Sequence, residues 1–339
     1  MVDFIQSILL QGHTMKKILL ALFLLFSFSL QAADVLPSWN DVKSKNEIIA
    51  YVKAVTDKNS SDFIEVKDRI ATFDNDGTLW TEQPAYFQLF FIMDRVKTLA
   101  PQHPEWKTEE PFASALKGDL KGVLKGGLEG LMALVMATHT GMSDEAFDAI
   151  VIEWIKTAKH PTKNVHYSEL IFQPMLELLD YLRANDFKTF IVSGGGIDFM
   201  RPFASEVYGI PSNQIVGSSI EVKYENRKII RLPKFRFNDD KAGKPVAIHY
   251  HIGKHPVLAG GNSDGDFAMM EYTEANPKHK SFQLYVHHTD EKREWAYDRK
   301  SHIGKFDKGL DYALKNNWTV VDMKNEWKVI YPFELKNKR

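Results

Sequence analysis

The stretch that decides the fold is Ile70-Ala-Thr-Phe-Asp-Asn-Asp-Gly-Thr-Leu-Trp80. Its first four residues predict a short buried strand. Two carboxylates, Asp74 and Asp76, follow where this run stops, and Gly77 and Thr78 allow the backbone to turn away. Because residues i and i+2 of an extended chain point to the same side, both carboxylates are expected to face one site. Two like charges held that close need a cation or a shared proton.

Such a pair of carboxylates suits phosphoryl transfer through a covalent intermediate. One carboxylate, bound to Mg²⁺ so that its charge does not repel an anionic phosphate, attacks phosphorus. The other carboxylate exchanges protons with the leaving group and then with water. The alternative interpretation is a pair of turn acids that cap a helix, which is the usual role of an Asp-rich loop.

Two further predicted strands also end in polar residues. Residues 187–192 predict a buried strand that leads into Ser193-Gly-Gly-Gly196, where the Ser193 hydroxyl and the backbone N–H groups around Gly194 would face an anion. Residues 256–260 predict a third strand, which ends in Gly261-Asn-Ser-Asp-Gly-Asp266. These oxygen ligands, without His or Cys, suit Mg²⁺. Flexible or Asx-rich turns are the alternative, although ligand sites at the carboxyl ends of parallel strands are the rule in open α/β sheets.

Between the first and second strands the chain is mostly helical in pattern. Residues 86–99 carry apolar side chains at helical spacing, and Ser143-Asp-Glu-Ala opens a helix that runs to about residue 158. We interpret residues 81–185 as an inserted helical cap. The α/β core then consists of residues 34–80 and 186–339.

Three later segments complete the expected elements. Residues 220–232 alternate like a hairpin, and Lys244 opens a helix from which it would project a point charge toward a phosphate. A surface position is the alternative for this lysine. Residues 318–323 and 327–330 alternate like two short strands at the end of the chain.

Composition excludes several classes of protein. The 339 residues include 43 basic and 44 acidic side chains, so the net charge of −1 leaves no basic footprint for nucleic acid. There is no cysteine, which excludes disulfides, thiolate nucleophiles and cysteine-ligated zinc. The length allows one large domain or two, with ample material for a core.

The beginning of the chain resembles a secretory signal peptide. Met15-Lys-Lys is followed by the uncharged residues 18–30 and by the small residues before Asp34. We therefore expect residues 1–33 to be a signal peptide, with Met15 as an alternative start, and the mature protein to be periplasmic or secreted. Because a membrane span needs roughly 20 apolar residues, no stable membrane anchor is expected after cleavage.

Four short segments of the chain resemble motifs one to four of the haloacid dehalogenase superfamily in their order, their spacing and the strands that precede them. They are Asp74-Asn-Asp-Gly-Thr78, Ser193, Lys244 and Gly261-Asn-Ser-Asp-Gly-Asp266, and the resemblance covers roughly residues 69–289. With its helical insertion between the first two motifs, the chain looks most like the phosphoserine-phosphatase-like branch. Secreted phosphorylcholine and acid phosphatases are similar in organisation. The resemblance implies a three-layer α/β core with a mainly parallel sheet and an inserted helical cap.

The resemblance also implies roles for five residues. Asp74 would be the nucleophile that forms an aspartyl phosphate, and Asp76 the general acid and base, with its backbone carbonyl also reaching Mg²⁺. Thr78 would stiffen the loop, Ser193 would hydrogen-bond the phosphoryl oxygens, and Lys244 would hold the phosphate and the nucleophile. Because the dehalogenases of the superfamily lack the second acid, a phosphatase acting on a small phosphomonoester is expected. Phosphotransferase or phosphonatase chemistry, and an exported binding protein without turnover, are the alternatives.

The fourth motif departs from the pattern of the superfamily. Many members have Gly-Asp at its start, whereas Asn262 follows Gly261 here. Either Asn262 supplies its amide oxygen to Mg²⁺, or Asp264 takes over the metal and Asp266 lies behind it. An amide ligand makes the site one negative charge poorer, so weaker metal binding is expected.

Substrate choice is expected to depend on the residues just beyond the nucleophile loop. Trp80 and Glu82 stand where this branch commonly places substrate-reading side chains. We hypothesise that Glu82 favours a leaving group with an amine or a quaternary ammonium, and that Trp80 offers an aromatic face. The alternative is that Glu82 caps the first helix of the cap.

Overall fold

The computed structural model describes residues 34–336. A single compact unit begins at Leu36. The predicted signal peptide, residues 1–33, lies outside the described residues and stays a prediction. Among residues 34–336, no helix combines the length and the apolar character that crossing a membrane requires.

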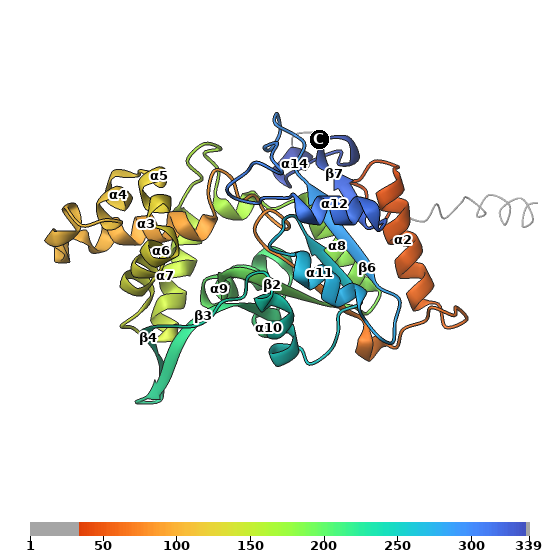
Figure 1. Cartoon of the computed structure of the whole chain (residues 1–339), viewed down its shortest axis with the longest axis horizontal. Coiled ribbons are helices and arrows are strands. Elements are labelled where there is room, and N and C mark those ends of the chain that lie inside the picture. The colour runs from red at the N-terminus through yellow and green to blue at the C-terminus, as the bar shows by residue number, and fades with distance from the viewer. Residues whose placement is uncertain (1–33, 337–339) are drawn as a thin grey trace, which may run out of the picture. The chain divides into compact units, whose positions relative to one another are not determined.

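Only helices lie between β1 and β2, whereas strands and helices largely alternate from β2 onward (Figure 1). The strands are β1 (Ile70–Phe73), β2 (Lys188–Gly196), β3 (Ile215–Glu225), β4 (Lys228–Phe237), β5 (Leu258–Gly261), β6 (Phe282–His287) and β7 (Thr319–Asp322). The first helices are α2 (Lys43–Thr56), α3 (Phe87–Leu99), α4 (Phe112–Lys117), α5 (Leu120–Lys125), α6 (Gly127–His139), α7 (Asp144–Thr157) and α8 (Gln173–Ala184). The later helices are α9 (Ile197–Tyr208), α10 (Gly243–His251), α11 (Phe267–Glu274), α12 (Lys308–Lys315), α13 (Met323–Glu326) and α14 (Phe333–Lys336).

The strands form one sheet in the order β4-β3-β2-β1-β5-β6-β7. Every neighbouring pair is parallel except β3 and β4, which form an antiparallel hairpin at one edge. The three strands predicted from the sequence, β1, β2 and β5, are neighbours at the centre of the sheet. The predicted α/β class with a mainly parallel sheet is confirmed.

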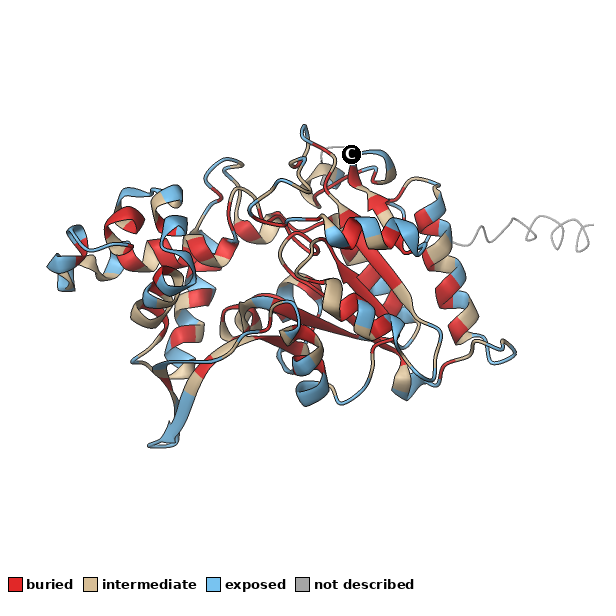
Figure 2. Cartoon of the chain, in the orientation of Figure 1, coloured by how far each residue is buried: buried red, intermediate tan, exposed pale blue. Residues whose placement is uncertain are grey.

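Helices cover both faces of the sheet and make three layers. Apolar residues of α2, α8 and α9 share one core cluster with Ile191 of β2, whereas the neighbouring Val192 belongs to a second cluster with α10, α11 and α12. Side chains that alternate along a strand point to opposite faces, so these clusters are the two cores of a doubly covered sheet. Figure 2 shows the buried residues concentrated in the strands and in the helix faces turned toward them.

The helices from α3 to α7 lie between β1 and β2 in the sequence and form the insertion (Figure 1). The helices α3 to α6 have an apolar cluster of their own, which includes Leu89, Val96, Trp106 and Leu134. The helix α7 packs against α9, and α8, which the sequence placed in the cap, packs against β2. The division into core and cap at residues 81 and 185 stays a prediction, with α8 lying on the core side of the insertion.

The hairpin of β3 and β4 reaches from the sheet to the inserted helices. Its tip is Asn226-Arg227, where both residues have positive φ, as two-residue hairpin turns require. Arg231 on β4 is 2% exposed, and it donates a hydrogen bond through Nε to the carbonyl of His139 at 2.6 Å. Its guanidinium also contacts Asp144 of α7 and Asp198 of α9. The predicted hairpin is therefore confirmed, and it joins the cap to the core.

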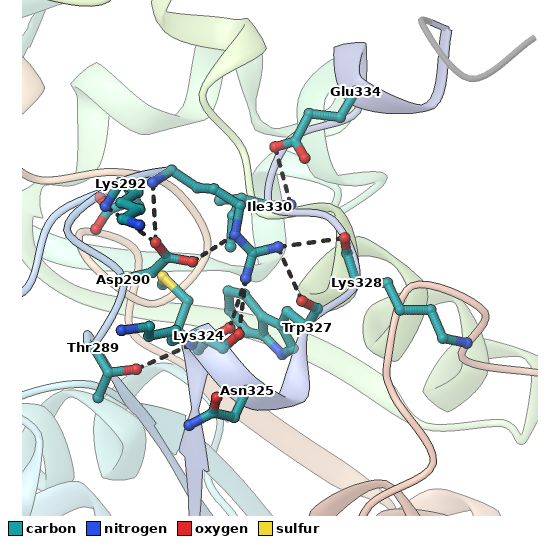
Figure 3. Close-up of polar contacts among 12 residues, drawn as sticks. Thr289, Asp290, Lys292, Lys324, Asn325, Trp327, Lys328, Ile330 and Glu334 are labelled. Atoms are coloured by element: carbon teal, nitrogen blue, oxygen red, sulfur yellow. Dashed lines mark hydrogen bonds and ion pairs between the residues drawn. The ribbon is translucent and has the colours of Figure 1, made fainter.

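The end of the chain differs from the prediction. Residues 319–322 form β7, but residues 327–330 form no strand. Arg293 holds this segment instead. Its guanidinium donates hydrogen bonds to four backbone carbonyls, those of Met323, Lys324, Trp327 and Lys328 (Figure 3). The same guanidinium forms an ion pair with Asp290. Trp327 makes an isolated antiparallel bridge with Trp39, so this segment pairs at a single position and does not form a strand.

Candidate active site

The loop after β1 is built by hydrogen bonds to one carbonyl. The carbonyl of Asn75 accepts hydrogen bonds from the backbone N–H groups of Thr78, Leu79 and Trp80 at 2.8 to 3.3 Å. Gly77 has a φ of 72°, and an added Cβ there would lie 2.0 Å from the amide nitrogen of Asn262. Glycine is therefore required at this turn, both for its backbone conformation and for the close approach of the fourth motif.

Lys244, the third motif, contacts residues in or beside the other three motifs. Its Nζ lies 2.6 Å from Oδ1 of Asp74, 2.7 Å from Oδ1 of Asp266 and 2.7 Å from the carbonyl of Val192, next to Ser193. Burial alone lowers the pKa of Lys244, but the carboxylates of Asp266 and Asp74 outweigh it and hold that pKa above its ordinary value. The lysine is therefore a fixed positive charge between the candidate nucleophile and the fourth motif.

Asp76 faces the second motif. Its Oδ1 accepts a hydrogen bond from the indole nitrogen of Trp80 at 2.8 Å. An added Cβ on Gly195 would lie 3.6 Å from Oδ2 of Asp76 and 3.4 Å from Oγ of Ser193. Both Asp76 and Ser193 therefore lie close to Gly195, at the carboxyl ends of β1 and β2. Burial raises the pKa of Asp76 to about 6.

The second motif is held by the insertion. The backbone N–H of Gly195 donates to Oγ of Ser193 at 3.1 Å, and that of Gly196 donates to Oε1 of Gln88 on α3 at 2.7 Å. Gly194 lies beneath the loop that follows β4, with Cβ of Asp240 3.6 Å from the position of an added Cβ. Because Gln88 comes from α3, the first inserted helix lies directly against the predicted anion-binding turn.

The two aspartates of the fourth motif, Asp264 and Asp266, bind different parts of the chain. Oδ2 of Asp266 accepts the backbone N–H groups of Asn262 and Ser263 at 2.9 and 3.0 Å, which fixes the turn. Oδ1 of Asp264 instead accepts the backbone N–H groups of Asp307 and Gly309 at 3.0 and 2.8 Å, at the start of α12. Asp264 thus acts as a helix-terminus acceptor.

Asn262 lies against the nucleophile loop, where the sequence left it as one of two possible metal ligands. Its Oδ1 accepts a hydrogen bond from the hydroxyl of Thr78 at 3.2 Å, and the side chain is 2% exposed. Of the two alternatives raised by the sequence, this arrangement favours Asn262 over Asp264.

The two side chains predicted to read the leaving group are buried against residues of the site. The ring of Trp80 is 1% exposed and packs against Phe87 and Phe203, with ring centroids 4.6 and 5.3 Å apart. An enclosed ring offers no open face to a ligand, so its contact with the site is the indole N–H on Asp76. Glu82 is 2% exposed and bonds Asn262, whereas α3 begins after Tyr86 without any side-chain cap. Neither predicted role of Glu82 matches these contacts.

Sequence reasoning missed a further carboxylate at this site. Asp239, in the loop after β4, is 0% exposed, and within residues 34–336 neither of its carboxylate oxygens meets the geometric criteria of a hydrogen bond, although the backbone of Ser193 lies near. Burial raises its pKa to about 8, Lys244 opposes this shift, and Asp74 adds to it. An Asp-Asp pair before a lysine looks like an ordinary polar loop, so the sequence carried no signal for it.

Residues 288–297, which follow β6, contact the loop after β1 that carries the candidate nucleophile. His288 lies 2.7 Å from the carbonyl of Gly77 through Nε2 and 3.0 Å from Glu294 through Nδ1, and both side chains are buried. The ring of Tyr297 stacks on His288 with centroids 4.3 Å apart. No local pattern predicts the contact of His288 with Gly77, because it joins positions 211 residues apart.

Comparison with known proteins gives a family and a set of distant structural matches. The sequence profile described as haloacid dehalogenase-like hydrolase matches residues 71–271. No curated protein matches the chain. A protein of unknown function from Bordetella pertussis is 12% identical, with 75% of this chain and 98% of the other covered and a TM-score of 0.48. One of unknown function from Anaerococcus prevotii is 17% identical, with 76% and 89% covered and a TM-score of 0.47.

A phosphoserine phosphohydrolase-like protein from Francisella tularensis is 16% identical, with 80% of this chain and 99% of the other covered and a TM-score of 0.38. The family profile spans β1, β2 and β5, the strands whose carboxyl ends bring the predicted motifs together. It also covers more than half of the sequence. The chain therefore belongs to the haloacid dehalogenase-like hydrolase family.

Proposed function

We propose that this chain is a Mg²⁺-dependent phosphomonoester hydrolase that works through an aspartyl phosphate on Asp74. The observation that carries the proposal is the position of Lys244. Its Nζ lies 2.6 Å from Oδ1 of Asp74, at the carboxyl end of the central strand β1. Asp76 and Ser193 both lie next to Gly195, at the carboxyl ends of the neighbouring strands β1 and β2. A nucleophile, an acid, a hydroxyl and a fixed cation gathered at one point are the parts that phosphoryl transfer needs.

The residues present fit a divalent cation. Burial and the nearby Asp266 carboxylate raise the pKa of Asp74, although Lys244 opposes them, so the cluster carries more negative charge than one lysine offsets. No three Asp, Glu or His side chains converge as a metal cage anywhere in residues 34–336. Asp74, the backbone carbonyl of Asp76 and Oδ1 of Asn262 would therefore hold Mg²⁺ together. When bound, Mg²⁺ neutralises phosphate charge and acts as a Lewis acid.

The protein's own residues account for the two halves of the reaction. An oxygen of Asp74 forms a bond to phosphorus while the bond from phosphorus to the leaving oxygen breaks, and Asp76 gives that oxygen a proton. In the second half Asp76 takes a proton from water, which attacks phosphorus and releases Asp74 and phosphate. Lys244 stabilises the charge on Asp74. Ser193 accepts the N–H of Gly195, so its own O–H is available to donate to a phosphoryl oxygen.

The second acid is what supports hydrolysis of a phosphate ester over dehalogenation. A leaving alkoxide needs a proton, whereas a leaving halide does not. The intact arrangement of Asp74, Asp76, Ser193 and Lys244 argues against a binding protein without turnover, and no contact favours phosphonatase or transferase chemistry. We also propose that the protein is exported, which rests on residues 15–33 of the sequence and is tested by cell fractionation.

The test is hydrolysis of 4-nitrophenyl phosphate by the full-length chain with Mg²⁺ and with a chelator. Turnover is expected to need Mg²⁺ and to disappear in Asp74→Asn, with the circular dichroism spectrum unchanged. Asp186→Asn, a surface substitution at the other end of the strands, is the control and should keep full activity. An acid-stable, hydroxylamine-labile phosphoryl group on the wild type would establish the intermediate. Full activity of Asp74→Asn would overturn the proposal.

A further inference from the structure

The buried carboxyl group of Glu82 contacts the side-chain amide of Asn262, the only amide among the candidate metal ligands. Oε1 of Glu82 lies 2.6 Å from Nδ2 of Asn262, although the two residues are 180 positions apart in the sequence. Both side chains are 2% exposed. Burial, reinforced by Asp76 and Asp74, raises the pKa of Glu82 well above its ordinary value, whereas hydrogen bonds from Tyr297 and Asn262 oppose the shift. A cation bound beside Asn262 would favour the charged form of this carboxyl group.

The contact fixes which way the amide of Asn262 points. A carboxylate accepts hydrogen bonds and does not donate them, so the NH₂ group must face Glu82. Oδ1 then points to the other side, where the hydroxyl of Thr78 donates to it at 3.2 Å. An amide flipped by 180° would place two acceptors against each other. Glu82 therefore holds Oδ1 of Asn262 toward the nucleophile loop.

The surrounding chain is shaped to admit this carboxylate. The hydroxyl of Tyr297 donates to the same Oε1 at 2.8 Å. An added Cβ would lie 2.4 Å from Oε1 at Gly77 and 2.0 Å at Gly304, so any other residue at either position would displace Glu82. Two glycines from separate loops and one tyrosine thus build a socket for a single charged group. Holding a charge in such a place is costly unless a compensating charge lies near it.

We propose that Glu82 is a positioning residue of the Mg²⁺ site: it orients the amide of Asn262 and, when Mg²⁺ is bound, supplies from behind it the negative charge that this amide lacks. The inference rests on the proposed function and goes beyond it, because it assigns to Glu82 neither substrate reading nor helix capping. An amide directed by a buried carboxylate is a stronger oxygen donor than a free amide, since the charged acceptor polarises it. Groups that orient ligands in this way commonly change metal affinity by about 10- to 100-fold when they are removed.

The substitution Glu82→Gln isolates the charge. The glutamine oxygen still accepts hydrogen bonds from Asn262 and Tyr297, so the packing of the socket is kept. We expect Mg²⁺ affinity, measured by isothermal titration calorimetry on the full-length chain, to fall by about tenfold or more. The unfolding temperature of the metal-free protein should not fall, because no hydrogen bond is lost. Glu326→Gln, at a half-buried carboxylate that accepts a hydrogen bond from Ser44 of α2 outside the site, is the matched control and should bind Mg²⁺ like the wild type.

The double variant Glu82→Gln with Asn262→Asp exchanges the two groups. It keeps the hydrogen bond with its polarity reversed and returns the charge to the site, so we expect Mg²⁺ affinity within a few-fold of the wild type. Unchanged affinity in Glu82→Gln overturns the inference, and so does a folded double variant that stays as weak as Glu82→Gln. A wild type that binds no Mg²⁺ would overturn the metal dependence in the proposed function, and this inference with it. A wild type that binds Mg²⁺ beside an unaffected Glu82→Gln overturns this inference alone.

Discussion

Acid should destabilise this protein through His139, the last residue of α6. The hydroxyl of Thr138 donates to the carbonyl of Leu134 at 2.7 Å, so at 2.8 Å from Nδ1 it can only accept the ring N–H. Oε1 of Gln88 is occupied by the N–H of Gly196, so the NH₂ group of Gln88 faces Nε2 of His139 at 3.2 Å. Both ring nitrogens are thus satisfied in the neutral form. A second proton on Nε2 would set donor against donor.

The electrostatics agree with this geometry. The side chain is 3% exposed, and burial, reinforced by Arg231 and Arg95, lowers the pKa of His139 from 6.5 to about 3. Because the unfolded chain takes up a proton below pH 6.5 and the folded chain does not, the full stability is present above that pH and is lost as the pH falls toward 3. Each pH unit in this window costs about 1.4 kcal/mol. The loss from His139 between pH 7 and pH 5 is therefore about 2 kcal/mol.

The perturbation that tests this is His139→Gln, which keeps a polar side chain but does not titrate. Urea unfolding followed by tryptophan fluorescence gives the free energy of unfolding of both proteins at pH 7 and pH 5. We expect the wild type to lose about 2 kcal/mol more than the variant over this interval, since all other titrations are common to both. His251→Gln on the partly exposed part of α10 is the control and should change the difference much less. Equal losses in the wild type and His139→Gln would refute the reasoning.

Three further predictions follow from single contacts. Arg231→Met should lower the free energy of unfolding by about 3 kcal/mol, because it leaves Asp198 without its buried partner; chemical unfolding measures this, and wild-type stability would contradict it. Lys244→Met should lower kcat for an aryl phosphate at least about 10²-fold while the chain stays folded, and a smaller loss would remove Lys244 from the mechanism. Asp264→Asn should lower the unfolding temperature and leave Mg²⁺ affinity unchanged, whereas Asn262→Ala should weaken Mg²⁺ binding; the reverse result would make Asp264 the ligand.

The central strands were predictable because their signals are local. Each is a short apolar run that ends in glycine and acidic or hydroxyl residues, and those residues mark the carboxyl end whatever the rest of the chain does. The helices α3 and α7 were predictable for a similar reason, since apolar spacing defines the first and Ser143 caps the second by accepting the N–H of Ala146. Local signals therefore placed Asp74, Ser193 and the fourth motif together at the carboxyl ends of the central strands.

What the sequence could not give is the direction in which side chains point once the chain has packed. Trp80 follows the nucleophile loop in the sequence, yet its ring lies in the core and only its N–H reaches Asp76. Asp239 stands in an ordinary polar loop, yet it is fully buried beside Lys244. In both cases part of the environment comes from elements far away in the sequence, such as Phe203 for Trp80 and Asp74 for Asp239.

The neighbours of Asn262 bear in the same way on the metal affinity expected of the fourth motif. Read position by position, an amide in place of a carboxylate means one charge fewer and a weaker metal site. In the folded chain Glu82 touches that amide, Tyr297 fixes Glu82, and glycines at positions 77 and 304 leave room for its carboxylate. The charge of a site is a property of everything buried around it, because the electrostatic interaction between buried groups is weakly screened. A motif that has lost a carboxylate should therefore be judged only after the neighbours of the replacement have been identified.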